Sequence, residues 1–315
     1  MKMLITEAQV LSNGDISFKD FEKYGELTVE QNLSYDELKN VIHNYDALFC
    51  NKLNIDKPLL DAAKNLKYIG ECATGYNNID INECKRRGIT VCNAGSYSTN
   101  AVAQQTFAYI LNHFSKVSFY DAFVKNNGWI NSPVFSPVVT CTDELSGKTL
   151  GIVGYGSIGR AVERIAKAFL MNVIVYTRTI YDESEADFVS LDELLSRSDI
   201  VSLHLPLTND NAGMFCKETF SKMKDGAYFI NTARGGLVNE PDLAEALISG
   251  KLSGAAVDVL TKEPMDKNCV LKTAPNITIT PHSAWVPYST RKRLIGIILE
   301  NLDGFINGTP KNKIV

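Results

Sequence analysis

The sequence of 315 residues lacks the patterns of several common protein classes. Its seven cysteines are scattered and include no C-x-x-C pair, which argues against a disulfide framework or a zinc site and favours a reducing cytoplasm. No apolar run approaches the roughly 18 residues of a membrane span. The 32 basic and 36 acidic residues give a net charge of −4, opposite in sign to a nucleic-acid-binding surface. We therefore expect no metal, membrane or nucleic acid as a partner.

Histidine is also scarce, and the chain contains only His43, His113, His204 and His282. Any search for a catalytic imidazole is therefore short. At roughly 100–200 residues per domain, the length predicts about two domains. The composition, 45% apolar and 22% charged, is that of a compact globular protein.

Two stretches of the chain alternate β-rich runs with helical patterns, which predicts two parallel sheets covered by helices. The expected strands of the first stretch are residues 3–6, 46–50, 66–70 and 89–92. Six strands in the second stretch would complete a doubly wound sheet: residues 149–153, 172–176, 199–203, 227–231, 254–258 and 276–280. Between the two stretches, residues 100–126 predict one long helix and residues 128–139 an irregular loop.

A glycine-rich turn directly follows the strand expected at residues 149–153. Gly154, Gly156 and Gly159 form a G-x-G-x-x-G motif that opens a helix. The first glycine of such a motif permits a tight turn, the second lets a pyrophosphate approach, and the third allows close helix packing. The alternative is a glycine-rich turn without a ligand, but the surrounding βαβ pattern favours a dinucleotide site.

The next strand ends without the acidic residue that usually binds the adenosine ribose. Thr177 and Arg178 stand there instead, and an arginine is the group that accommodates a 2′-phosphate. The sequence therefore admits NADPH. Alternatively, Arg178 is a solvated surface residue and NADH binds through hydroxyl contacts.

Polar side chains follow each of the last three expected strands. Arg234 follows the first, Glu263 the second and His282 the third. Singly, such residues are more often salt-bridge partners, loop residues or structural hydrogen-bond donors. Together they would meet at one crevice, because the carboxyl ends of parallel strands share an edge of the sheet.

Four motifs in this order resemble those of the D-isomer-specific 2-hydroxyacid dehydrogenase family over nearly the whole chain. They read GYGSIG at 154–159, NTARGG at 231–236, DVLTKEP at 258–264 and PHSAW at 281–285. The resemblance implies an α/β protein with two doubly wound parallel-sheet domains. A Rossmann cofactor domain would span residues 99–286, and a smaller, discontinuous, flavodoxin-like substrate domain would span residues 1–98 and 287–315.

The resemblance also implies roles for individual residues. Arg234 would bind the substrate carboxylate and ketone oxygen, His282 would be the acid/base, and Glu263 would pair with His282. Ala73, Thr74, Gly75 and Trp285 would complete the substrate site with Arg234 and His282. Besides the glycine motif, Thr177, Arg178, Arg234 and His282, the implied cofactor contacts are Val102, Ser157, Ile158, Pro206, Thr232, Ala233, Asp258 and Ala284.

Within the family, the segments ATGYN at 73–77, YSTNAVAQ at 97–104 and HSAW at 282–285 most resemble the glycerate dehydrogenase, or hydroxypyruvate reductase, branch. Two departures stand out. The missing ribose-binding carboxylate puts strict NAD preference in doubt. The end of the sequence at Val315 speaks against the serine-regulated phosphoglycerate dehydrogenases.

The expected function is reduction of hydroxypyruvate or glyoxylate to D-glycerate or glycolate with NAD or NADP as cofactor. His282 would protonate the carbonyl oxygen, Glu263 would favour its imidazolium form, and Arg234 would stabilise the developing charge. Closure of the two domains would exclude water. The alternatives are a D-lactate-type or broad 2-ketoacid reductase, and a dinucleotide-sensing protein like the corepressors that share these motifs. The resemblance further implies a homodimer built on the cofactor domain, with residues 115–139 as its arm.

Overall fold

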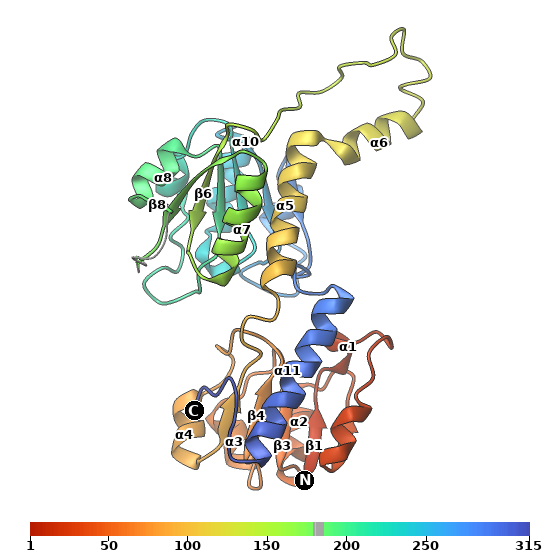
Figure 1. The fold of residues 1–315 in the computed structure, drawn as a ribbon, viewed down its shortest axis with the longest axis vertical. Helices are drawn as coiled ribbons and strands as arrows, with labels where there is room; N and C mark the ends of the chain where they lie inside the picture. The colour runs from red at the N-terminus through yellow and green to blue at the C-terminus, as the bar shows by residue number, and fades with distance from the viewer. Residues whose placement is uncertain (179, 181–185) are drawn as a thin grey trace. The chain divides into compact units, whose positions relative to one another are not determined.

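The structure, a computed structural model, describes residues 1–178, 180 and 186–315, which form two compact units. The first unit comprises residues 1–98 and 286–315, and the second comprises residues 99–285. The domain boundary expected from the sequence lies one residue later, at 287. Figure 1 shows both ends of the chain in the first unit, which is therefore discontinuous.

The first unit contains a five-stranded, fully parallel sheet in the order β2-β1-β3-β4-β5. This is the flavodoxin-like order that the resemblance implied. Its strands are β1 (Lys2–Ile5), β2 (Glu26–Val29), β3 (Ala47–Cys50), β4 (Tyr68–Glu71) and β5 (Thr90–Cys92). The sequence predicted all but β2, a four-residue edge strand with no fully buried side chain and hence no strong apolar signal.

Helices cover both faces of this sheet. On one face, α2 (Tyr35–Val41), α3 (Lys57–Ala62) and α4 (Ile81–Arg87) bury Leu38, Leu60 and Cys84 against the strands. On the other face lies α11 (Tyr288–Ile306), whose Phe305 packs on Tyr68 of β4. The shorter helices of the unit are α1 (Ala8–Leu11), η1 (Lys19–Tyr24) and η2 (Ile42–Asn44).

The second unit contains a seven-stranded parallel sheet in the order β12-β11-β10-β9-β6-β7-β8. The strands are β6 (Thr149–Val153), β7 (Asn172–Tyr176), β8 (Asp187–Phe188), β9 (Ile200–Leu203), β10 (Ala227–Asn231), β11 (Leu252–Val257) and β12 (Ile277–Ile279). The order reverses between β6 and β9, as in a Rossmann fold, and this switch point is where ligands bind. The sequence predicted six of these strands and missed β8, which has only two residues.

Helices cover this sheet on both faces as well. One face packs on α5 (Thr99–Ser115) and α7 (Ser157–Ala168). The other face packs on α8 (Leu191–Arg197), α9 (Lys217–Lys222) and α10 (Glu240–Ile248). The single-turn helices η3 (Gly235–Leu237) and η4 (Val270–Thr273) lie in loops beyond β10 and β11.

The helix expected over residues 100–126 is two helices. Lys116 has a φ of 53°, in the left-handed region, so α5 ends at Ser115 and α6 (Val117–Lys125) begins beyond it. No residue of α6 is buried. Figure 1 shows α6 and the following loop extending away from the body of the second unit. The expected irregular loop at residues 128–139 contains no regular secondary structure beyond turns.

Among the described residues, no helix is long and apolar enough to cross a membrane. Over the same residues, no three His, Cys, Asp or Glu side chains gather as a metal site.

Candidate active site and dinucleotide pocket

The glycine motif forms the turn between β6 and α7. Gly154 has a φ of 98°, and a Cβ there would lie 2.8 Å from the backbone of His204. At Gly159 a Cβ would lie 2.3 Å from the Gly154 carbonyl oxygen, so the helix packs directly on the turn. At Gly156 a Cβ would meet nothing within 4 Å. The first and third glycines are thus required by the fold, while the second faces open space.

A pocket of about 370 Å³ lies over this turn at the switch point of the sheet. The glycine turn, the end of β7 and the segment after β9 form its walls. The pocket is lined by Gly154, Tyr155, Gly156, Tyr176, Thr177, Arg178, His204, Leu205, Pro206, Thr208, Asp210, Asn211 and Met214. It therefore brings together five residues that were predicted to bind the cofactor: Gly154, Gly156, Thr177, Arg178 and Pro206.

The remaining predicted cofactor residues occupy three places in the second unit. Ser157 and Ile158 form the first turn of α7, and the Ser157 hydroxyl lies 3.2 Å from that of Thr99. Val102 is buried in α5. The others follow the ends of β10, β11 and β12 and are all buried: Thr232, Ala233, Asp258 and Ala284. The buried Thr232 hydroxyl has no partner within the described chain.

His282 and Glu263 form a hydrogen-bonded pair beyond the ends of β12 and β11. His282 Nδ1 lies 2.7 Å from Glu263 Oε2, and about a quarter of each side chain is exposed. The other Glu263 oxygen accepts the Leu260 N–H at 3.1 Å. Because both carboxylate oxygens are engaged, the carboxylate holds the imidazole ring in one orientation, and Nε2 is the ring nitrogen that Glu263 does not engage.

Arg234 follows β10 in a loop that Asn231 organises. The Asn231 side chain accepts the Ala233 N–H at 3.0 Å and donates to the Arg234 carbonyl at 2.9 Å. At Gly235 a Cβ would lie 1.9 Å from the Leu260 carbonyl carbon, so no other residue fits there. This close approach places the loop of Arg234 against the loop that leads to Glu263.

Asp258 holds the turn that carries His282. Its carboxylate accepts the N–H groups of Ser283 at 2.8 Å and Ala284 at 2.9 Å, and its carbonyl accepts the His282 N–H at 2.7 Å. The Thr280 hydroxyl donates to the same carboxylate. Asp258 is 2% exposed, so it holds the turn by hydrogen bonds from the protein interior.

The predicted substrate residues Ala73, Thr74 and Gly75 follow β4 in the first unit. Thr74 is exposed, and the other two are half-buried. Within the described chain, none of their three N–H groups donates a hydrogen bond. Backbone N–H groups without an acceptor are suited to bind an anion such as a carboxylate. Trp285, also predicted for the substrate, is half-buried at the last residue of the second unit.

The other histidines differ from His282 in their surroundings. Burial lowers the pKa of His204 to about 3, and its Nε2 lies 2.9 Å from the Ser202 hydroxyl. Burial, with Lys116 nearby, lowers the pKa of His113 to about 4. Both side chains are therefore neutral at physiological pH and are poor candidates for a proton donor.

Three side chains that position these loops were not found from the sequence. Asn231 braces the Arg234 loop, Thr280 supports Asp258, and Glu240 accepts the Thr261 N–H at 2.7 Å. Asn231 belongs to a motif that the sequence did single out, so its position was a usable signal. Thr280 and Glu240 carry no such signal, because their partners are apparent only in three dimensions.

Comparison with protein-family models places residues 107–284 in the D-isomer specific 2-hydroxyacid dehydrogenase, NAD binding domain. A hydroxypyruvate reductase of Blautia hydrogenotrophica is 36% identical over all of this chain and 99% of its own length. A glyoxylate reductase of Thermococcus litoralis is 38% identical over 82% of this chain and 80% of its own.

Solved structures agree with the sequence comparisons. The TT0316 protein from Thermus thermophilus matches the full length of both chains with a TM-score of 0.91 and 34% identity. An acyclic imino acid reductase in complex with NADPH and D-Arg matches both full lengths with a TM-score of 0.89 and 29% identity. A D-lactate dehydrogenase from Aquifex aeolicus, complexed with NAD and lactic acid, has a TM-score of 0.83 and 28% identity over 98% of this chain and 96% of its own.

Proposed function

The chain belongs to the D-isomer specific 2-hydroxyacid dehydrogenases, and we propose that it reduces hydroxypyruvate or glyoxylate with a reduced nicotinamide dinucleotide. Relatives named hydroxypyruvate reductase and glycerate dehydrogenase support this choice of substrates. The observation that carries the proposal is the contact between His282 Nδ1 and the Glu263 carboxylate, because a carbonyl reductase requires a positioned proton donor.

The proposed reaction adds a hydride and a proton to the ketone. The dinucleotide supplies the hydride. His282 donates the proton from Nε2, since Glu263 engages Nδ1. Arg234 offers a fixed positive charge to the substrate carboxylate and the developing alkoxide. We assign the remaining carboxylate contacts to the N–H groups of residues 73–75. This assignment is a prediction that rests on the family resemblance and on the absence of any acceptor for these groups within the described chain.

The residues around the glycine turn fit a dinucleotide. The space above Gly156 is open, the first turn of α7 begins there, and the pocket beside it, of about 370 Å³, lies in the size range of small-molecule sites. We propose that the exposed Arg178 accepts a 2′-phosphate, so that NADPH binds at least as well as NADH. One of the comparison structures contains NADPH and another contains NAD, so the preference between NADPH and NADH is a separate measurement.

Absorbance at the reduced-cofactor band tests the proposed function. We expect oxidation of NADH or NADPH with hydroxypyruvate and glyoxylate, and slower oxidation with pyruvate. His282→Ala and Arg234→Ala should each lower kcat/KM by a factor of about 100 or more. Turnover near that of the unmodified enzyme in either variant contradicts the roles assigned. No oxidation with any pair of cofactor and keto acid favours the dinucleotide-sensing alternative.

The cofactor assignment has its own test. Arg178→Ala should raise the KM for NADPH about tenfold and leave the KM for NADH nearly unchanged, since only the former carries the additional phosphate. An equal change for both cofactors contradicts a contact between Arg178 and a 2′-phosphate.

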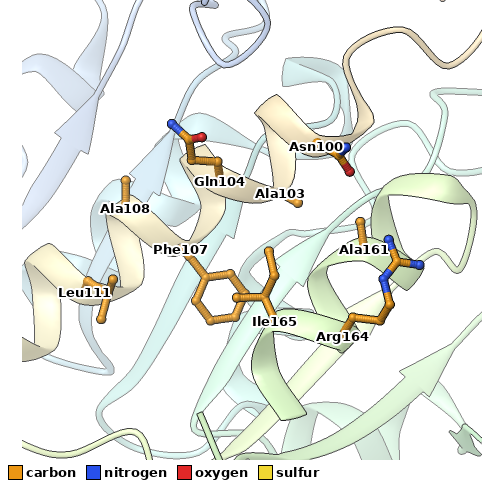
Figure 2. A pocket seen from close by; sticks show the side chains of 9 residues that line it. All are labelled: Asn100, Ala103, Gln104, Phe107, Ala108, Leu111, Ala161, Arg164 and Ile165. Atoms are coloured by element: carbon orange, nitrogen blue, oxygen red, sulfur yellow. The ribbon is translucent and has the colours of Figure 1, made fainter. Parts of the chain in front are cut away.

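We further propose a homodimer formed through the second unit. Residues 115–139 include many exposed apolar side chains, among them Ile130, Phe135 and Val138. Figure 2 shows a groove between α5 and α7 in the same unit, where Phe107 and Ile165 lie close together. A contiguous exposed apolar surface typically marks a site of protein–protein contact. A second copy of the chain is the partner that the family resemblance implies.

The cytoplasm remains the expected compartment. All seven cysteines are unpaired, and four of them are buried. Free buried thiols are typical of proteins that fold in a reducing environment.

A further inference from the structure

The loop that follows β4 is held by its carbonyl groups. The Cys72 carbonyl accepts the Asn51 side-chain amide at 2.8 Å, and the Thr74 carbonyl accepts the Asn93 side-chain amide at 2.7 Å. Between them, the Ala73 carbonyl accepts the Ala94 N–H at 2.9 Å. Three successive carbonyl groups are therefore bonded to the rest of the first unit.

The direction of each carbonyl fixes the direction of the next N–H. The peptide bond is planar and trans, so the C=O of one residue and the N–H of the following residue point in opposite directions. The bonds that fix the carbonyls of residues 72–74 therefore also fix the directions of the N–H groups of residues 73–75. These are the three N–H groups that donate to no acceptor within the described chain.

Asn51 is itself held firmly. It is 5% exposed at the end of β3, and its N–H donates to Glu7 Oε2 at 2.7 Å. The same carboxylate accepts the N–H of Lys52 at 3.0 Å. Glu7 is 6% exposed and follows β1, so the neighbouring strand supports this asparagine.

Asn93 is held next to β5, the strand on the other side of β4 from Asn51. It follows β5, and its Oδ1 accepts the Gly95 N–H at 3.1 Å while its amide reaches the loop. Its carbonyl accepts the side-chain amide of Asn301 at 2.8 Å, and Asn301 is fully buried in α11. The Asn301 side-chain oxygen in turn accepts the side-chain amide of Asn312 at 2.9 Å.

We propose that Asn51 and Asn93 are positioning residues that aim the N–H groups of Ala73, Thr74 and Gly75 at the carboxylate of the keto acid. The proposal rests on the proposed function, because it takes this loop as the carboxylate site. The two asparagines act from β3 and β5, the strands on either side of β4, and neither contacts the substrate. Their effect falls on substrate binding and not on the dinucleotide, whose pocket lies in the second unit.

Isosteric substitution tests the two amides. Asn51→Asp and Asn93→Asp replace the donating NH₂ by an oxygen and keep the shape, while Asn51→Ala and Asn93→Ala remove the donor without adding charge. Asn65→Asp is the matched control, because Asn65 makes the same kind of bond, to the His43 carbonyl at 2.7 Å, elsewhere in the first unit. Thermal unfolding of every variant identifies those that fold.

We expect the Asp and Ala variants that fold to raise the KM for hydroxypyruvate about 10- to 100-fold, because a carbonyl that has lost its donor no longer fixes the direction of the next N–H. The KM for the reduced cofactor should stay unchanged, kcat should change much less than KM, and Asn65→Asp should match the unmodified enzyme. Unchanged KM values for the keto acid overturn the proposal, as does an increase confined to the Asp variants, which would indicate charge repulsion.

Binding of oxalate to the protein saturated with reduced cofactor, measured by calorimetry, separates this proposal from the proposed function. Weaker oxalate binding in both asparagine variants supports the positioning role even where no keto acid is turned over. Equal oxalate binding in all variants overturns it, even where the unmodified protein reduces hydroxypyruvate as proposed. If a single variant fails to fold, the other asparagine carries the test.

Discussion

His282 has a backbone conformation that few side chains adopt. Its φ is 53°, and the left-handed region costs an ordinary residue roughly 1–2 kcal/mol relative to glycine. The turn keeps this conformation because the carbonyl and carboxylate of Asp258 accept three successive N–H groups, those of His282, Ser283 and Ala284. The buried aspartate thus offsets the strain at the residue to which we assign proton transfer.

Glycine and alanine at this position should separate stability from activity. We expect His282→Gly and His282→Ala to be equally inactive, while the glycine variant has a free energy of unfolding about 1 kcal/mol higher than the alanine variant. Urea unfolding of both variants measures the difference. Equal stability would indicate that the turn is not strained at this residue.

A second prediction at this scale concerns acid stability and His113. Burial lowers its pKa to about 4, whereas an unfolded chain has a histidine pKa near 6.5. Between these values the unfolded state binds a proton that the folded state does not. The free energy of unfolding should therefore fall as the pH drops from about 6.5 to about 4, by on the order of 1 kcal/mol.

His113→Phe should lose this part of the pH dependence. Phenylalanine keeps a ring to stack on Tyr228, whose centroid lies 3.9 Å from that of His113, but it has no titratable group. Unfolding measured at several pH values compares the two slopes. An identical slope in the variant would assign the acid sensitivity to other groups.

At the scale of elements, the glycine turn shows that one motif serves two purposes. The carbonyl of Gly154 lies against Gly159, which makes the third glycine part of the packing between turn and helix. A Cβ at Gly156, which caps the start of α7, would meet nothing within 4 Å. The fold does not require glycine at position 156, and we therefore assign this glycine to the proposed contact with the dinucleotide.

Alanine at the two positions should give opposite results. Gly156→Ala should unfold at the same temperature as the unmodified protein but bind the reduced cofactor about tenfold or more weakly, because the methyl group projects into the pocket. Gly159→Ala should lower the free energy of unfolding by about 1–3 kcal/mol through its clash with the Gly154 carbonyl. Thermal unfolding and cofactor titration measure both. A destabilised Gly156→Ala would contradict the ligand role.

The sequence did not reveal the break between helices α5 and α6. The helical pattern continues through residues 100–126, and lysine has no preference for the left-handed conformation that Lys116 adopts. Nothing local ends the helix, and α6 buries no side chain on its own unit. Its apolar residues Val117, Phe119 and Val124 stay exposed, which is consistent with the proposed dimer arm.

At the scale of the whole molecule, that arm leads to a prediction about assembly. Phe135 and Val138 are more than nine-tenths exposed. Replacing both by aspartate should convert the proposed dimer to a monomer, since burying charges in an apolar interface is costly. Light scattering coupled to gel filtration measures the mass. Ile248→Asp, a change at another exposed apolar residue, in α10, is the control and should leave the dimer intact. A dimer that persists in the double variant excludes this part of the arm.

Much of both sheets could be predicted because parallel strands buried on two faces are continuous apolar runs. The strands that were missed, β2 and β8, lie at sheet edges, where half-exposed short strands leave no such run. The candidate site could be anticipated as a set of motifs, and the structure brings His282 and Glu263 into contact as the resemblance implied. The roles of these residues in catalysis stay predictions.

By itself, the sequence determined the family, the two-sheet architecture and the residues that follow each strand, because these depend on local patterns of apolar residues, glycines and short motifs. Only the tertiary structure decided which side chains hold the site in place. Asn51 lies 21 residues from its partner Cys72, Asn93 lies 19 from Thr74, and Asp258 lies 25 from Ser283. Hydrogen bonds between such distant residues form only when neighbouring strands bring their ends together, so no local pattern encodes them.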